Sequence, residues 1–248
     1  MNDVIEQIEK SGVVLDGAGG EHPAFPTSMD SNEGRTIHDA VVEIGAINTL
    51  EVGMAYGMST LHICEALRDQ PRGRHIAIDP FQEEEFDNIG LLNLERAGLR
   101  DRVDFFSALS HMALPKLAKS GVTLDFALID GAHVFDYAFV DFFYVDLMLR
   151  PGGIICLDDT WLLAIQKIAR FYTRNRSYEI HRGRIPSPVG ARIRRTVKHL
   201  VGPSAFQAVR RLLRRGGPHN RSTDPLLFLR KSADRPSIDW NAEYIIDF

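Results

Sequence analysis

Acidic side chains end two of the apolar segments that the sequence predicts to be strands. Asp130 ends the segment 125–130, and Asp158 ends the segment 153–158 with Asp159 directly behind it. Because the carboxyl ends of parallel strands meet at one edge of a sheet, we expect these three carboxylates to lie together. Their mutual repulsion favours a divalent cation with oxygen ligands, such as Mg²⁺, Mn²⁺ or Ca²⁺. Asp130, Asp158 and Asp159 are therefore predicted metal ligands; the alternative is that Asp158 or Asp159 caps the helix expected near Trp161.

A histidine lies close to this acidic cluster. His133 follows Asp130 by three residues, on the predicted loop into the next helix. An imidazole, with an ordinary pKa of about 6.5, suits a general base near neutral pH. We therefore expect His133 and Asp130 to be catalytic, with His133 removing a proton from an acceptor hydroxyl, directly or by way of a metal-bound hydroxyl. The alternative is a histidine that stacks on a ligand or is satisfied by backbone groups.

A glycine turn follows the predicted strand 49–53. Its candidate ligand-binding residues are Glu51, Gly53, Met54, Tyr56, Gly57 and Ser59. Gly53 permits a tight turn, and Gly57 opens a helix whose free N–H groups favour an anionic group. The spacing is neither the dinucleotide pattern G-x-G-x-x-G nor a P-loop. An acid followed by such a loop fits a ligand that has an amino-acid end and no pyrophosphate; the alternative is a purely structural turn.

A further acid, Asp79, ends the predicted strand 75–79. In doubly wound nucleotide sites an acidic side chain at this place accepts hydrogen bonds from both ribose hydroxyls. The alternative is that Asp79, which directly precedes Pro80, caps a helix. Together, the glycine turn and this acid indicate a nucleoside site.

The elements that position these residues alternate regularly along the chain. Strands are expected at 49–53, 75–79, 103–106, 125–130, 153–158, 177–180 and 226–230, and helices at 59–68, 86–97, 110–119, 134–149 and 161–175. Alternation of apolar strands with helices predicts a doubly wound, mostly parallel, Rossmann-like α/β sheet of about seven strands. The run Arg150-Pro-Gly-Gly153 is interpreted as a helix stop and a turn.

Three regions are expected on this basis. Residues 1–35 form an N-terminal arm with little regular structure, residues 36–181 and 224–248 form the Rossmann-like domain, and residues 182–223 form a basic helical insertion between the last two strands. Residues 182–221 hold 11 Lys or Arg and no acid, whereas the rest of the chain has 18 basic and 33 acidic residues. Such a block suits an anionic membrane surface, an acidic partner or phosphates; the alternative is a solvated lid. Nucleic acid is disfavoured, because the block has no interleaved aromatic residues.

Composition excludes other classes of protein. Of the 248 residues, 44% are apolar and 25% are charged, which is typical of a globular protein and not of a disordered one. There is no uncharged apolar run of about 18 residues that would span a membrane, and no secretory leader is visible. Cys64 and Cys156 are expected to be buried, reduced thiols. These features predict a cytoplasmic protein, with the basic block as a route to peripheral membrane contact; oligomeric state stays open.

The motifs together resemble those of class I S-adenosylmethionine-dependent methyltransferases. Within that class the chain is similar, over about residues 36–159, to the small O-methyltransferases that include catechol-type and macrolide-sugar-type enzymes. The matching residues are Glu51 to Ser59, Ile129-Asp-Gly-Ala-His133, Asp141, Leu149 to Gly153, and Asp158-Asp159. The resemblance implies that Glu51, Gly53 and Ser59 surround the methionine part and that Asp79 holds the ribose. It also implies that the loop after the third strand borders the adenine, through Ser107, Ala108 and Leu109. Asp130 is expected to contact the cofactor as well.

The resulting functional prediction is methylation of a small hydroxylated acceptor on oxygen. S-adenosylmethionine is the expected cofactor, and Mg²⁺ or another divalent cation assists by binding two vicinal hydroxyls and lowering the pKa of one. A sugar, a polyketide or a phenolic compound would fit as acceptor. The alternatives are an N- or RNA-methyltransferase of the same fold, and a non-catalytic binding module that uses the basic helices.

Overall fold

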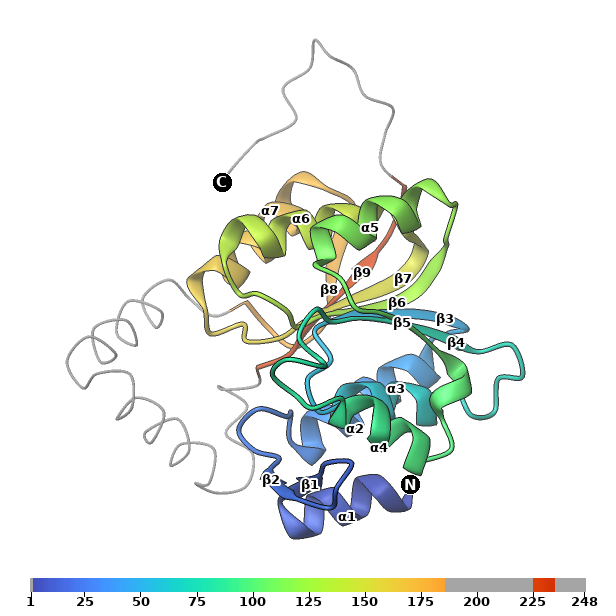
Figure 1. The fold of residues 1–248 in the computed structure, drawn as a ribbon. Helices are drawn as coiled ribbons and strands as arrows, with labels where there is room; N and C mark the ends of the chain where they lie inside the picture. The colour runs from blue at the N-terminus through green and yellow to red at the C-terminus, as the bar shows by residue number, and fades with distance from the viewer. Residues whose placement is uncertain (1, 186–224, 235–248) are drawn as a thin grey trace, which may run out of the picture.

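The computed structural model describes residues 2–185 and 225–234. Its centre is a seven-stranded sheet in the order β5-β4-β3-β6-β7-β9-β8 (Figure 1). The strands are β3 (Asn48–Val52), β4 (Arg74–Ile78), β5 (Val103–Phe106), β6 (Leu124–Ile129), β7 (Leu149–Leu157), β8 (Tyr178–Arg182) and β9 (Leu227–Lys231). Strands β3 to β7 pair in parallel, and β9 is antiparallel to both of its neighbours. The predicted mostly parallel, doubly wound sheet is confirmed.

Helices cover both faces of the sheet. They are α2 (Ser31–Glu43), α3 (Met58–Ala66), α4 (Ile89–Arg96), α5 (Ser110–Lys119), α6 (Phe135–Met148) and α7 (Leu163–Asn175), with a short 3₁₀ turn, η1 (Arg100–Arg102). Helices α2 to α4 lie on one face and α5 to α7 on the other (Figure 1). Each face of the sheet packs against its helices in a separate hydrophobic core. Side chains alternate between the two faces along a strand, so Leu128 of β6 lies in the core on the α3 side and Ile129 in the core on the α6 side.

The predicted turn at Arg150-Pro-Gly-Gly153 is wrong in one respect. Helix α6 does end at Met148, but the run lies inside β7, where the pairing with β6 shifts in register between Leu124 and Phe126. Gly152 has a φ of +82° there. Leu149 pairs with Leu124 and Ile154 with Phe126, so residues 150–153 bulge out opposite Asp125, and the reversal that proline and glycine allow lies within the bounds of β7.

The N-terminal segment is also more regular than expected. It forms α1 (Asp3–Ser11), the hairpin of β1 (Val13–Leu15) and β2 (Glu21–Pro23), and the start of α2. Ile5 and Ile8 of α1 are buried in the core shared with α2 and α3. The expectation of little regular structure in residues 1–35 is therefore wrong. Glycine here ends a helix, because Gly12 is the left-handed C-cap of α1.

Most of the predicted basic insertion, together with residues 235–248, lies outside the described residues. Its helices and its expected membrane or acidic partner therefore stay predictions. The strands before and after it in the sequence, β8 and β9, pair with each other from Tyr178 and Lys231 to Arg182 and Phe228. Within residues 2–185 and 225–234, no helix combines the length and the apolar character that crossing a bilayer requires.

Candidate functional site

A cavity of about 580 Å³ opens at the carboxyl ends of the parallel strands. It lies where the strand order reverses between β3 and β6, the place where open α/β sheets bind ligands. Its volume is typical of small-molecule sites. The predicted site residues that line it are Gly53, Met54, Ser59, Asp79, Leu109, Asp130, His133, Asp158 and Asp159.

The glycine turn after β3 is held in a conformation that requires glycine at Gly53. Its φ is +87°, and a Cβ added there would lie 2.3 Å from the carbonyl oxygen of Asp130. The backbone of the turn and the end of β6 therefore lie too close together for a side chain at position 53. Gly57, also in the left-handed region, is the N-cap of α3. The turn consequently delivers the N-terminus of α3 to the cavity, with Ser59 in its lining.

Asp79 fastens the glycine turn to the end of β4. Its Oδ2 atom accepts hydrogen bonds from the backbone N–H groups of Met54 (2.9 Å) and Ala55 (2.8 Å). Its Oδ1 atom accepts one from the N–H of Phe81 (2.8 Å). The next helix, α4, begins only at Ile89, so Asp79 is not the helix cap that the alternative proposed. Nε2 of Gln82 also donates to Oδ2 (3.3 Å), so the remaining acceptor direction of this carboxylate is on Oδ1. Binding of the ribose by Asp79 stays a prediction.

Two amide side chains, which the sequence reasoning did not identify, hold the other side of the turn. Gln82 donates through Nε2 to the carbonyl of Ala55 (2.6 Å), and Asn93 donates through Nδ2 to the carbonyl of Tyr56 (3.0 Å). Both amides are buried. They bind two carbonyl groups of the turn, while Asp79 accepts hydrogen bonds from two of its N–H groups.

Five predicted cofactor contacts lie elsewhere. The described residues that line the cavity do not include Glu51, Tyr56, Gly57, Ser107 or Ala108. The Tyr56 ring packs edge-on against Phe86 at 5.4 Å between centroids.

Beyond β5, the lining begins at Leu109. It continues through Ser110 and His111, because α5 starts directly after Leu109 and turns its first residues inward.

Glu51 is fully buried on the α3 side of the sheet. Its Oε1 atom accepts a hydrogen bond from the Thr60 hydroxyl and lies 3.3 Å from Nε2 of His75. The His75 ring in turn contacts the hydroxyl of Thr49 at 2.8 Å. The structure therefore places this acid in an internal polar network, and its contact with the ammonium group of a ligand stays a prediction.

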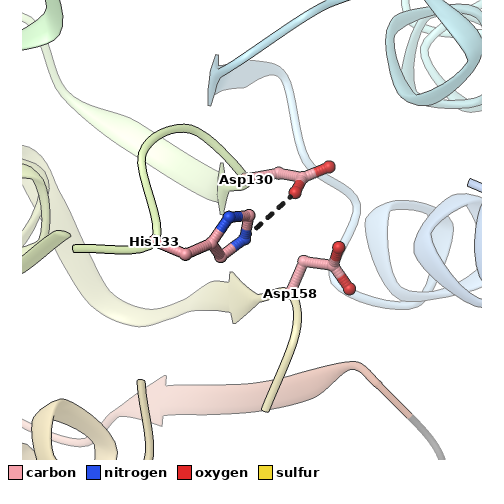
Figure 2. Close-up of side chains that lie close together, drawn as sticks. All are labelled: Asp130, His133 and Asp158. Atoms are coloured by element: carbon pink, nitrogen blue, oxygen red, sulfur yellow. Dashed lines mark ion pairs between the residues drawn. The ribbon is translucent and has the colours of Figure 1, made fainter. Parts of the chain in front are cut away.

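The structure brings together two of the three predicted carboxylates, Asp130 and Asp158, with His133 in the place expected for Asp159. Asp130 follows β6, His133 lies on the loop into α6, and Asp158 follows β7 (Figure 2). Nε2 of His133 lies 3.5 Å from Oδ1 of Asp130. One side-chain ligand atom from each of Asp130, His133 and Asp158 lies within 4.8 Å of the others, a spacing that a single cation could bridge.

Burial of Asp158, reinforced by the negative charges of Asp130 and Asp159, raises the pKa of its carboxyl well above the ordinary value. Its Oδ1 atom is buried and has no hydrogen-bond partner among the described residues. A partly buried carboxylate that faces other carboxylates and has one oxygen without a hydrogen bond is an environment that a bound cation relieves.

Asp159 lies beside this group and is held by a hydrogen bond outside it. Its Oδ1 atom accepts a hydrogen bond from the Trp161 indole (2.7 Å), and its Oδ2 atom lies 3.9 Å from His133. The N-cap of α7 is Leu162, so neither Asp158 nor Asp159 caps that helix as the alternative proposed. The structure therefore groups His133, and not Asp159, with Asp130 and Asp158.

The N-terminal segment supplies cavity residues that were not predicted. Ser28 and Met29 precede α2 and line the cavity together with Glu33. Asp30 is the N-cap of α2: its side chain accepts from the N–H of Glu33, while Glu33 Oε2 accepts from the N–H of Asp30 (2.7 Å). The spacing Asp30-x-x-Glu33 is that of a capping box, the one sequence signal that predicts this helix start.

Comparison with known proteins agrees with this geometry. Residues 50–160 match the family of methyltransferase domains. Caffeoyl-CoA O-methyltransferase 2 of Eucalyptus globulus is 32% identical over 143 residues, which cover 56% of this chain and 56% of that protein. The matched part is therefore little more than half of the relative's length. The predicted resemblance to methyltransferase enzymes is confirmed.

Solved structures show the same fold. The O-methyltransferase from Bacillus cereus, in complex with SAH, aligns with a TM-score of 0.58 and 22% identity over 73% of this chain and 83% of that one. The O-methyltransferase TomG from Streptomyces achromogenes, in complex with SAM, aligns with a TM-score of 0.58 and 18% identity over 73% of this chain and 82% of that one. At these identities the likeness shows a shared fold alone.

Proposed function

We propose that this protein transfers the methyl group of S-adenosylmethionine to an oxygen of a small hydroxylated acceptor, with the help of a divalent cation. One observation carries the proposal. A single cavity at the reversal point of the sheet holds both the glycine turn with Asp79 and the group of Asp130, His133 and Asp158. A nucleoside site and an acid–base site that share one cavity suit a transfer reaction between two bound molecules.

The cofactor is expected to lie across the ends of β3 and β4. Asp79 is placed for the ribose, and the N-terminus of α3 near Ser59 favours the carboxylate of the methionine part. The sulfonium methyl group would then point toward the ends of β6 and β7, where His133 lies.

The donor set fits a hard divalent cation such as Mg²⁺. Asp130 and Asp158 supply oxygen ligands, and the buried, unpartnered Oδ1 atom of Asp158 is the observation in favour. A bound cation would hold two vicinal hydroxyls of the acceptor and lower the pKa of one. His133, whose Nε2 atom lies beside Asp130, is the candidate base that accepts the proton.

Apolar side chains offer a wall for a planar acceptor. Met29, Phe81, Leu109 and Tyr137 line the cavity, and the last three are partly exposed at its mouth. The names of the matched plant relatives specify caffeoyl-CoA, a phenolic thioester. The aromatic side chains of the cavity and the phenolic compound named for these relatives together favour a phenolic acceptor over a sugar.

The test is a methylation assay with vicinal diphenols and tritiated cofactor, run with Mg²⁺ and with EDTA. We expect transfer with Mg²⁺ and its loss with EDTA. We further expect His133→Ala to lower turnover by about 10² while SAH binding, measured by calorimetry, is retained. His38→Ala, a change at a half-exposed histidine on α2, is the control and should leave turnover unchanged.

Three results would contradict the proposal. Absence of SAH binding to the wild-type protein would favour the non-catalytic binding module. Transfer to nitrogen or to RNA in place of phenolic oxygen would favour the other predicted alternative. Equal turnover with and without EDTA would show that the reaction needs no divalent cation.

A further inference from the structure

Glu33 is an acid in the cavity wall that the mechanism above does not use. It lies in the first turn of α2 with 7% of its surface exposed, and it lines the cavity. Its negative charge contributes to the raised pKa of Asp158. Glu33 is therefore close enough to the ends of β6 and β7 to act on them electrostatically.

The neighbouring residue places Glu33 beside the start of α3. A Cβ added to Gly34 would lie 2.2 Å from the ring of His62, one turn into α3. The absence of a side chain at Gly34 thus lets α2 pack directly on α3. Because α2 packs on α3 at Gly34, and α3 begins at Met58 beside the glycine turn, we place Glu33 on the α3 side of the cavity, where we expect the methionine part of the cofactor.

The charges of the cavity explain what such an acid could bind. The described lining residues include five carboxylates and no Lys or Arg; the carboxylates are Glu33, Asp79, Asp130, Asp158 and Asp159. The methionine part of the cofactor is a zwitterion. The N-terminus of α3 complements its carboxylate, and the ammonium group requires an acidic partner.

The other acids are less available for this task. Glu51, the acid predicted for it, is buried against Thr60 and His75. Asp79 is committed to the glycine turn, and Asp130 and Asp158 belong to the candidate cation site. Glu33 accepts a hydrogen bond from the N–H of Asp30, and a carboxylate has about four acceptor directions, so that bond is compatible with an ammonium donor.

We propose that Glu33 binds the ammonium group of the cofactor, and that the Ser28 hydroxyl takes part in the same subsite. Ser28 is 6% exposed and lines the cavity, and its Oγ atom has no hydrogen-bond partner among the described residues. This inference rests on the proposed function, because it assumes a cofactor with an amino-acid end. It assigns recognition of that end to the N-terminal segment and not to the strand acid Glu51.

The test compares SAH with its deaminated analogue, in which hydrogen replaces the ammonium group. Calorimetry in EDTA separates the measurement from any effect of a cation. Glu33→Gln removes the charge but keeps an acceptor for the N–H of Asp30, so the capping box survives. Asp39→Asn, which removes a charge from an exposed position of the same helix, is the matched control.

We expect the wild-type protein to bind SAH about tenfold or more tightly than the deaminated analogue. In the Glu33→Gln variant, SAH should weaken by about tenfold while the analogue binds as before or more tightly. In Asp39→Asn the preference for SAH should be unchanged.

Weakening of both compounds by the same factor in Glu33→Gln would overturn the proposal and leave Glu33 a structural residue. An unchanged preference for SAH in that variant would overturn it as well. Either outcome leaves the proposed function intact, whereas failure of the wild-type protein to bind SAH at all would refute the proposed function itself.

Discussion

A buried histidine makes a prediction about acid stability that can be worked out quantitatively. His62 of α3 is 2% exposed, and its Nε2 atom lies 3.9 Å from Oε1 of Glu9 in α1. Burial lowers the pKa of His62 from 6.5 to about 4; the charges of His38 and Arg35 add to this, and that of Glu9 opposes it. In the folded protein the ring is therefore neutral at pH 6, where in the unfolded chain it is largely protonated.

The sign follows from proton binding. Between pH 6.5 and about 4 the unfolded chain binds more protons at His62 than the folded protein does. The free energy of unfolding therefore has its full value above pH 6.5 and falls as the pH falls toward 4. At about 1.4 kcal/mol for each pKa unit, complete loss amounts to roughly 3 kcal/mol, a large fraction of the stability of a domain.

Urea unfolding of the wild-type protein and of His62→Phe at several pH values between 7.5 and 4 measures this contribution. Phenylalanine fills the space beside Gly34 and does not titrate, so the variant should lose about 3 kcal/mol less over that range. Other groups titrate in both proteins and cancel in the difference. His38→Phe removes one of the charges that lower the pKa of His62 but leaves the ring buried, so most of the pH dependence should remain. Parallel curves for the wild type and His62→Phe would refute the reasoning.

Two further predictions concern the cavity. Gly53→Ala should destabilise the fold by about 2 kcal/mol or more and abolish SAH binding, since its Cβ meets Asp130; Gly45→Ala, with a φ of +57° and no atom within 4 Å, is the control for backbone strain alone, and equal effects of the two in urea unfolding would contradict the account. Burial raises the pKa of Asp141 to about 6, although the Ser110 hydroxyl and His111 oppose it. The folded protein therefore becomes less stable as Asp141 ionises with rising pH. In urea unfolding, the stability of Asp141→Asn relative to the wild type should increase by up to about 3 kcal/mol between pH 4 and 7.5. A stability difference that does not change with pH would contradict this prediction.

The central strands and the acids just beyond them could be predicted from sequence for a definite reason. A buried parallel strand is a short apolar run, and its end is marked by the first polar or glycine residue. Asp79, Asp130 and Asp158 each follow directly after the last residue of a strand, and the structure brings all three to the cavity. At the end of a strand, position in the sequence is enough to fix position in the sheet.

Glu51 shows where that reasoning fails. It lies inside β3, one residue before the strand ends, and pairs with Ala77 and Leu128 in the neighbouring strands. Its neighbours Leu50 and Val52 face the core on the α6 side. Alternation therefore sends Glu51 to the opposite face, against Thr60 of α3. The acid was correctly recognised as part of a motif, but its distance from the strand end decides which way it points.

The N-terminal segment was underestimated for a related physical reason. Its elements are short, and its glycine and proline residues suggest an irregular arm, yet the capping box of Asp30 and Glu33 fixes the start of α2. Gly34 then allows α2 to press on His62 of α3. The same contact that buries His62 and lowers its pKa brings Glu33 to the cavity. Acid stability and cofactor recognition should therefore be coupled here: a bulkier residue at position 34 would separate the two helices, raise the pKa of His62 and move Glu33 away from the cavity together.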